Sequence, residues 1–142
     1  MILFFSEDIQ FPHIKKRITK QWIQKIAVEN KKKIGKVSII FCSDSYLLKL
    51  NKKYLKHNYF TDIITFNYNH LNLLNGDIFI SLETIAKNAS IYNVTVENEL
   101  FRVIIHGILH LIGYDDKTNE QKKLMKMMED SALFEINKMI VS

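Results

Sequence analysis

The chain has 142 residues, of which 47% are hydrophobic and 25% are charged, with a formal net charge of +5. This composition excludes a disordered protein, and the length suits one domain over residues 1–142 that buries its own core. No apolar run reaches the roughly 18 residues that span a bilayer. The first residues lack the cationic segment of a signal peptide, and the single cysteine, Cys42, excludes an internal disulfide and indicates a reducing compartment.

The first part of the chain predicts two strands that alternate with two helices. A short strand, ILFF, precedes a helix over residues 12–30, which has apolar residues at helical spacing and Pro12 in its first turn. KVSIIFC indicates a buried strand that contains the thiol of Cys42. Ser43 or Asp44 can then cap a second helix.

Two further strands and a helix are predicted next. DIITFNYN and NGDIFIS have the β-branched and aromatic residues that are typical of strands. A turn through Asn75 and Gly76 is expected to precede the second of them. A helix that begins near Ser81 and extends to about Tyr92 follows.

Two helices complete the chain. The first, VENELFRVIIHGILHLI, has Thr95 and Asn98 at its start and ends at Gly113. The last begins at Thr118 and covers about residues 118–139. Its expected apolar face consists of Leu124, Met128, Ala132 and Ile136. This order of elements predicts an α+β fold with a small mixed β-sheet and about five helices.

The helix that ends at Gly113 carries a candidate metal site. His106 and His110 are four residues apart, so both imidazoles lie on one face and can bind one ion. Gly113 allows a left-handed turn that can bring the following residues back toward the histidines. Asp116 is then the expected third ligand, although Asp115 and Asp116 could instead form the turn or cap the last helix. Two imidazoles, one carboxylate and an open position are typical of catalytic zinc, so one Zn²⁺ ion is the expected cofactor.

The spacing of this site is also that of the metzincin proteases. Those enzymes have a glutamate directly after the first histidine as general base. Gly107 occupies that position in this chain. Glycine cannot transfer a proton, so a peptide-cleaving metallohydrolase is disfavoured. Tyr114, in the turn after the helix, is expected to pack rather than to act in catalysis.

The positive charge is concentrated in the N-terminal part of the chain. Residues 1–56 contain thirteen Lys or Arg and four Asp or Glu, whereas residues 57–142 contain seven and eleven. This division is typical of a polyanion-binding face, for which nucleic acid is the usual partner. A cluster of Lys31, Lys32 and Lys33 stands where the first helix is expected to end. The same pattern can reflect a biased genome, because eighteen of the twenty cations are Lys.

Three segments resemble one protein family. HGILHLIGYDD, residues 106–116, resembles the HGxLHLxGYDH signature of the YbeY family of bacterial rRNA maturation endoribonucleases. LNKKYLKHNYFTDIITF resembles that family's LNxxYRxxDxxTDVLSF segment, and NGDIFIS resembles its LGDIxIS strand. The resemblance covers nearly the whole chain. It implies a zincin-like α+β domain that binds one zinc ion and cleaves single-stranded RNA, in the maturation of rRNA ends (the small-subunit 3′ end) and in ribosome quality control in the cytoplasm.

The chain departs from the family pattern at two positions. The family's third ligand is a histidine, and Asp116 occupies that position, so the implied site has His106, His110 and Asp116 as ligands and a charge lower by one. The family's arginine aligns with Leu55, which cannot bind phosphate. Three neighbours are close enough in sequence to replace it as contacts for RNA: Lys53, Lys56 and His57.

Two functions of different classes follow. The leading interpretation is a zinc-dependent endoribonuclease whose partners are single-stranded RNA, rRNA above all, and the ribosome or its proteins; neither DNA nor a membrane is expected. The alternative is a catalytically weak or inactive metal-binding factor of the ribosome, which the loss of the family's arginine favours. The sequence assigns no general base, and the nucleophile is either water or the RNA 2′-hydroxyl.

Overall fold

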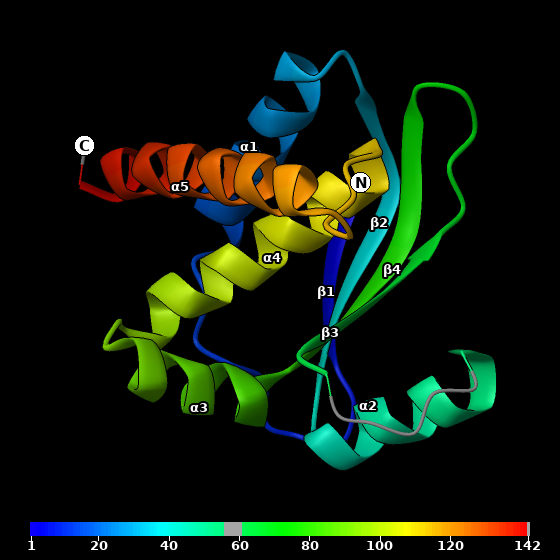
Figure 1. Ribbon diagram of the computed structural model, residues 1–142, viewed down its shortest axis with the longest axis vertical. Coiled ribbons are helices and arrows are strands. Elements are labelled where there is room, and N and C mark those ends of the chain that lie inside the picture. The colour runs from blue at the N-terminus through cyan, green and yellow to red at the C-terminus, as the bar shows by residue number, and fades with distance from the viewer. Residues whose placement is uncertain (56–60, 142) are drawn as a thin grey trace.

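The computed structural model describes residues 1–55 and 61–141, which form a four-stranded sheet and five α-helices (Figure 1). This arrangement confirms the predicted α+β class. None of the helices in these two ranges has the length and apolar character to span a bilayer. In chain order the elements are β1 (Ile2–Ser6), α1 (Lys16–Glu29), β2 (Lys33–Cys42), α2 (Asp44–Leu50), the π-helical segment η1 (Asn51–Leu55), β3 (Ile63–Asn67), β4 (Leu73–Ser81), α3 (Leu82–Tyr92), α4 (Val96–Ile112) and α5 (Asn119–Val141).

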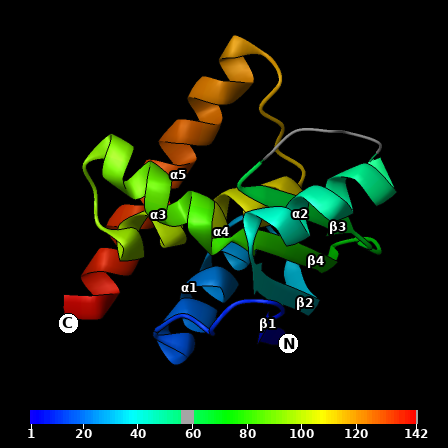
Figure 2. The same cartoon turned by 90° about the horizontal axis from the view of Figure 1, so that it is seen from below.

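The sheet is mixed and has the strand order β1-β2-β4-β3. β1 pairs with β2 and β2 pairs with β4 in parallel, whereas β3 pairs with β4 in the antiparallel sense. Successive side chains of a strand point to opposite faces, so each face buries a different set of residues. The main core contains Ile39, Ile78 and Ile80 together with apolar residues of α1, α4 and α5. A smaller cluster around Cys42 and Leu47 lies under α2 on the other face, and Figure 2 shows α2 apart from α1 and α5.

Hydrogen bonds confirm where the last four of the predicted helices begin. The side-chain oxygens of Ser43, Ser81 and Thr95 each accept a bond from the backbone N–H three residues later. Thr118 accepts the equivalent bond from the N–H of Gln121, just before α5. These bonds satisfy backbone donors that the first turn of a helix leaves free. The starts of α4 and α5, the two helices that surround the candidate site, are therefore determined locally.

The first helix is shorter than predicted. α1 begins at Lys16, and Pro12 lies before the helix instead of in its first turn. Phe11 and Ile14 are partly buried against the main core. The ring of Phe11 meets that of Phe41 edge to face, with 5.6 Å between the ring centroids. Packing of these two apolar residues favours a non-helical path for the segment that contains the proline.

The predicted turn through Asn75 and Gly76 is wrong, because both residues lie inside β4. The chain reverses earlier, through Leu71, which has a φ of 55°. A Cβ on Gly76 would lie 2.6 Å from the carbonyl oxygen of Phe66 and 2.8 Å from a methyl group of Leu111. Gly76 therefore allows β3 and α4 to approach β4 closely, which is a common role of glycine inside a strand.

The buried face of α5 is rotated relative to the predicted one. Ala132 and Ile136 are buried as expected, but Met125 enters the core and Leu124 is 47% exposed. Glu129 is also buried on this face, with 8% exposure. A buried carboxylate needs a partner, and the residues that it contacts belong to the candidate site.

Candidate metal centre

Close packing of α4 on the sheet positions the two histidines. Gly107, between them in sequence, faces the strands: a Cβ there would lie 2.8 Å from the side chain of Ile63 and 3.0 Å from that of Ile78. The glycine therefore permits the close contact between α4 and the sheet. A larger side chain would collide with these isoleucines, so the position has no room for the glutamate that a metzincin carries.

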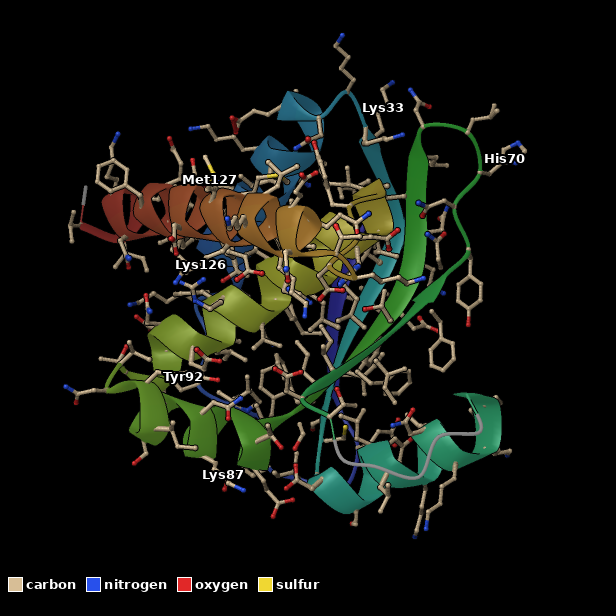
Figure 3. All side chains as sticks on the ribbon, in the orientation of Figure 1. Lys33, His70, Lys87, Tyr92, Lys126 and Met127 are labelled. Carbon is tan, nitrogen blue, oxygen red and sulfur yellow. The ribbon has the colours of Figure 1, made fainter. Side chains whose placement is uncertain are left out.

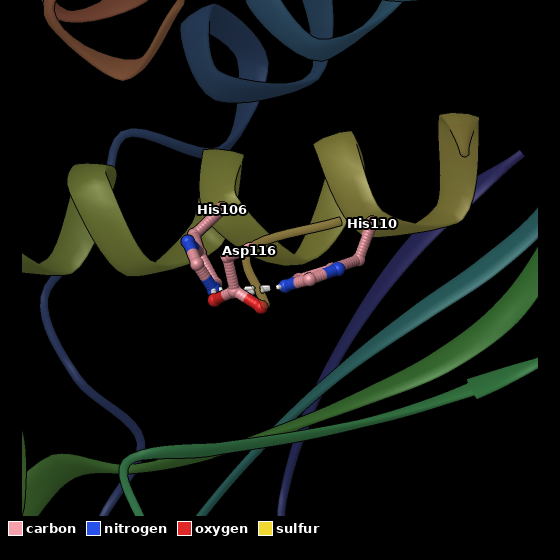
Figure 4. A group of neighbouring side chains, drawn as sticks. All are labelled: His106, His110 and Asp116. Carbon is pink, nitrogen blue, oxygen red and sulfur yellow. Dashed lines mark hydrogen bonds and ion pairs between the residues drawn. The ribbon is translucent and has the colours of Figure 1, made fainter. Parts of the chain in front are cut away.

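The structure brings His106, His110 and Asp116 together at the end of α4, as Figure 4 shows. The Nε2 atoms of the two histidines are 3.0 Å apart. One carboxylate oxygen of Asp116 lies 3.3 Å from Nε2 of His106 and 3.5 Å from Nε2 of His110. All three side chains are partly exposed, so an ion and a substrate could reach these atoms from solvent.

These distances match the requirements of a small tetrahedral ion. Two donor atoms bound about 2 Å from one tetrahedral ion lie roughly 3.3 Å apart, and the three observed separations are 3.0, 3.3 and 3.5 Å. When both rings are neutral and carry their hydrogen on Nδ1, the two Nε2 atoms and the carboxylate oxygen offer three lone pairs to one cation. The donor set and its geometry therefore fit Zn²⁺ with a fourth position open.

The turn after α4 carries Asp116 back to the histidines, as predicted. Gly113 has a φ of 126°, in the region that favours glycine. Its backbone N–H and that of Tyr114 both donate to the carbonyl of Leu109, at 3.1 and 3.0 Å. The hydroxyl of Tyr114 donates to Oδ1 of Asn30 at 2.8 Å, and its ring packs against the main core. Tyr114 thus anchors the turn to the end of α1, which agrees with its expected packing role.

Glu129 of α5 completes the surroundings of His106 and was not predicted from the sequence. Its Oε2 lies 2.7 Å from Nδ1 of His106, and its Oε1 accepts a bond of 2.8 Å from Arg102. A second nitrogen of Arg102 donates to Asp130 at 2.7 Å. An ionised carboxylate can only accept, so Nδ1 of His106 carries the hydrogen, and in the neutral ring this leaves the lone pair on Nε2. The sequence signal was a carboxylate on the apolar face of α5.

Several carboxylates act on the protonation of this region. Burial alone would lower the pKa of His106, but the hydrogen bond and charge of Glu129, followed by the charges of Asp116 and Asp62, raise that pKa above its ordinary value. Burial raises the pKa of Asp62, and the charge of His106 acts in the opposite direction. Asp62 lines a cavity of about 180 Å³ with His106 and Glu129. In the sequence, only the resemblance of TDIITF to the family's TDVLSF could have indicated that Asp62 lies near the site.

The predicted contacts for RNA are spread over the molecule. Lys31 and Lys32 follow α1, and Lys33 begins β2 (Figure 3). Lys53 is exposed on η1, with its Nζ 5.2 Å from the ring centroid of Tyr54. Their binding of RNA stays a prediction. Two other predicted contacts, Lys56 and His57, lie outside the described residues.

The position of the family's arginine lies beside that segment. Leu55 is the last residue of η1, and only its backbone belongs to the described part of the chain. The ring of Tyr54, its neighbour, meets Phe66 of the smaller cluster, with 5.8 Å between centroids. This end of η1 therefore lies over the face of the sheet opposite α4.

Comparison with known proteins identifies the family of this chain. The family model described as Endoribonuclease YbeY matches residues 4–137. Endoribonuclease YbeY of Bacteroides fragilis is 48% identical over 132 residues, which cover 93% of this chain and 95% of that protein. The protein of the same name from Porphyromonas gingivalis is 42% identical and covers 99% and 93%. The solution structure of a Thermotoga maritima protein has a TM-score of 0.67 at 26% identity, covering 96% of this chain and 89% of that one. The chain belongs to the endoribonuclease YbeY family.

Proposed function

We propose that this protein is a zinc-dependent endoribonuclease that cleaves single-stranded RNA and acts on rRNA ends in the cytoplasm, in association with the ribosome. The observation that carries the proposal is the convergence of His106, His110 and Asp116 on one point. It occurs in a chain whose relatives bear the name Endoribonuclease YbeY. The site is partly open to solvent, as a site for a polymeric substrate must be.

The residues of the chain have distinct roles in this proposal. His106, His110 and Asp116 would hold the ion, and bound Zn²⁺ would supply positive charge for a phosphoryl oxygen or a water of lowered pKa. Glu129 holds the His106 ring in the orientation that directs Nε2 toward the other donors. Arg102 in turn holds Glu129 through an ion pair of 2.8 Å. Arg102 also forms an ion pair with Asp130, but that carboxylate is 53% exposed and does not contact His106.

Two departures from the family pattern favour a second function. Leu55 stands where the family pattern has an arginine, and an aliphatic side chain cannot neutralise phosphate. A protein that binds metal and rRNA without cleaving it would tolerate this replacement. Asp116 points the same way, because its negative charge partly offsets that of the ion and weakens the attraction of phosphate.

Cleavage assays with and without metal separate these functions. The purified full chain, loaded with Zn²⁺, is incubated with a single-stranded RNA, a duplex RNA and a peptide, each with and without chelator. We expect cleavage of the single strand alone, and its loss on chelation. His110→Ala should abolish it, whereas His70→Ala, at an exposed histidine between β3 and β4 that is not one of the candidate ligands (Figure 3), should not.

The outcomes have clear meanings. Binding of RNA without cleavage would favour the non-catalytic factor, and chelator-sensitive cleavage of the peptide would indicate a peptidase. Equal activity of the two histidine variants would exclude the proposed site. The new RNA ends identify the nucleophile, because attack by the 2′-hydroxyl leaves a 2′,3′-cyclic phosphate and attack by water does not.

A further inference from the structure

A cavity of about 560 Å³ opens directly beside the candidate metal centre. Its floor is the face of α4 that carries Asn98, Arg102 and His106, and α5 forms one wall. The opposite wall is the end of α3 with the connection to α4, and Figure 3 shows Tyr92, the last residue of α3, and Lys126 of α5 on opposite sides of α4. The size lies within the usual range of small-ligand sites, roughly 300–1,000 Å³.

The wall between α3 and α4 offers an uncovered aromatic surface. Tyr92 is 62% exposed and Val94 is 39% exposed. Within residues 1–55 and 61–141, no hydrogen bond or ring contact fixes the phenol of Tyr92. Met125 of α5 also lines the cavity, but it is only 3% exposed, so Tyr92 supplies the main apolar surface. A flat π-system can stack on that phenol ring, and aromatic side chains that bind single-stranded nucleic acids do so through base stacking.

The rim of the cavity that α5 provides is positive. Lys122 and Lys126 are exposed, and neither forms an ion pair with another described residue. The cavity also contains three carboxylates, and neighbouring groups reduce the negative charge of each. Glu129 accepts hydrogen bonds from Arg102 and His106.

The two other carboxylates of the cavity repel an anion less than their number suggests. Asp116 is one of the three candidate ligands, so a bound cation would offset its charge. Burial raises the pKa of Glu99, which is 4% exposed, so that its neutral form is favoured relative to an ordinary glutamate. Lys122 and Lys126 therefore supply positive charge that the cavity does not cancel.

We propose that this cavity binds the unpaired nucleotide next to the scissile phosphate, with its base stacked on Tyr92 and its phosphate held by Lys122 and Lys126. The proposal rests on the proposed ribonuclease function and adds a substrate-binding site to it. His106 and Asp116 line the same cavity, so a nucleotide bound there has a phosphate beside the candidate ligands. A base in a duplex is paired and stacked and cannot enter, which gives the site a preference for single strands.

Binding measurements on exposed residues test the stacking. Affinity for a fluorescein-labelled single-stranded RNA that carries 2′-O-methyl groups is measured by anisotropy, because this RNA can bind without attack by a 2′-hydroxyl. Loss of one base–aromatic stack corresponds to a weakening of roughly 5- to 150-fold. We expect Tyr92→Ala to fall in this range and Tyr92→Phe to stay near wild type. Tyr68→Ala, at a tyrosine that is 60% exposed but outside the cavity, is the matched control.

A lysine series tests the phosphate contacts separately. Lys122→Gln and Lys126→Gln should each reduce the dependence of log affinity on log salt concentration by about 0.7, the value for one phosphate contact on a single strand. Lys123→Gln, on the same helix but outside the cavity lining, should leave that slope unchanged. The zinc content of every variant is measured, since a loss of metal would reveal damage to the site instead of loss of a contact.

Unmodified RNA then distinguishes the two proposals. Tyr92→Ala should raise KM by a factor similar to the loss of affinity and leave kcat largely intact. If wild type binds RNA but does not cleave it, the proposed function fails and the cavity is still tested by affinity. If Tyr92→Ala binds RNA as Tyr68→Ala does, the cavity proposal fails even when cleavage is confirmed. If wild type binds no RNA, both fail.

Discussion

Glu129 should control the zinc affinity of the centre although it does not contact the ion. Its Oε2 lies 2.7 Å from Nδ1 of His106, a short distance that is typical of a charge-assisted bond. The carboxylate is 8% exposed, so solvent screens it little. A carboxylate in this position fixes the histidine tautomer and makes Nε2 a stronger donor. Loss of such a partner typically reduces metal affinity by about 10- to 100-fold, or roughly 1.4 to 2.8 kcal/mol.

Two substitutions separate the charge of Glu129 from its hydrogen bond. Glu129→Gln keeps the size and an acceptor oxygen, so the loss of zinc affinity should lie near the lower limit of about 10-fold. Glu129→Ala removes both and should approach the upper limit. Competition with a chromophoric chelator at constant pH measures the dissociation constant, and thermal unfolding of the metal-free protein shows whether the fold has suffered.

Asp130→Asn is the matched control. Asp130 is the next residue on α5 and contacts the same arginine, at 2.7 Å, but it is 53% exposed and does not contact His106. We expect Asp130→Asn to leave zinc affinity at the wild-type value. Folded Glu129 variants that retain the zinc affinity of Asp130→Asn would show that Glu129 has no effect on the histidine that it contacts.

Three further outcomes are expected. Asp116→His should retain zinc after dialysis, because the position is 40% exposed and imidazole is an equally suitable ligand; a folded variant without metal would indicate a turn that accepts only carboxylate. Replacement of Lys31, Lys32 and Lys33 by Gln should weaken the binding of single-stranded RNA and flatten its salt dependence without loss of zinc, whereas equal anisotropy titrations of variant and wild type would support genome bias. Burial raises the pKa of the Cys42 thiol to about 12, so Ellman's reagent should modify this thiol rapidly only after unfolding. The free energy of unfolding should decline as the pH rises from the unfolded pKa of about 8.5 toward the folded pKa, because only the unfolded thiol ionises in that range. Rapid modification of the native protein at pH 8 would contradict this burial.

Local sequence determined most of the elements and the three candidate ligands. The i, i+4 spacing of His106 and His110 is sufficient to place both rings on one face of a helix. Gly113 is sufficient to predict a left-handed turn after it, since few other residues adopt a positive φ. The capping residues marked where helices begin because their hydrogen bonds reach only three residues along the chain. These features depend on neighbours in the sequence, and the structure agrees with each of them.

Tertiary structure decided what depends on the crossing of distant elements. An Asn-Gly pair indicates a turn in isolation. Gly76 instead lies within β4, at a point where β3 and α4 pack so closely that there is no room for a side chain. The apolar residues of α5 permit two faces, and packing against α4 selected the one with Met125 and Glu129. The partnership of Glu129 with His106, and the cavity between Tyr92 and Lys126, likewise exist only where three helices meet. No local pattern encodes these contacts, because each depends on the angle and separation of elements that are far apart in the chain.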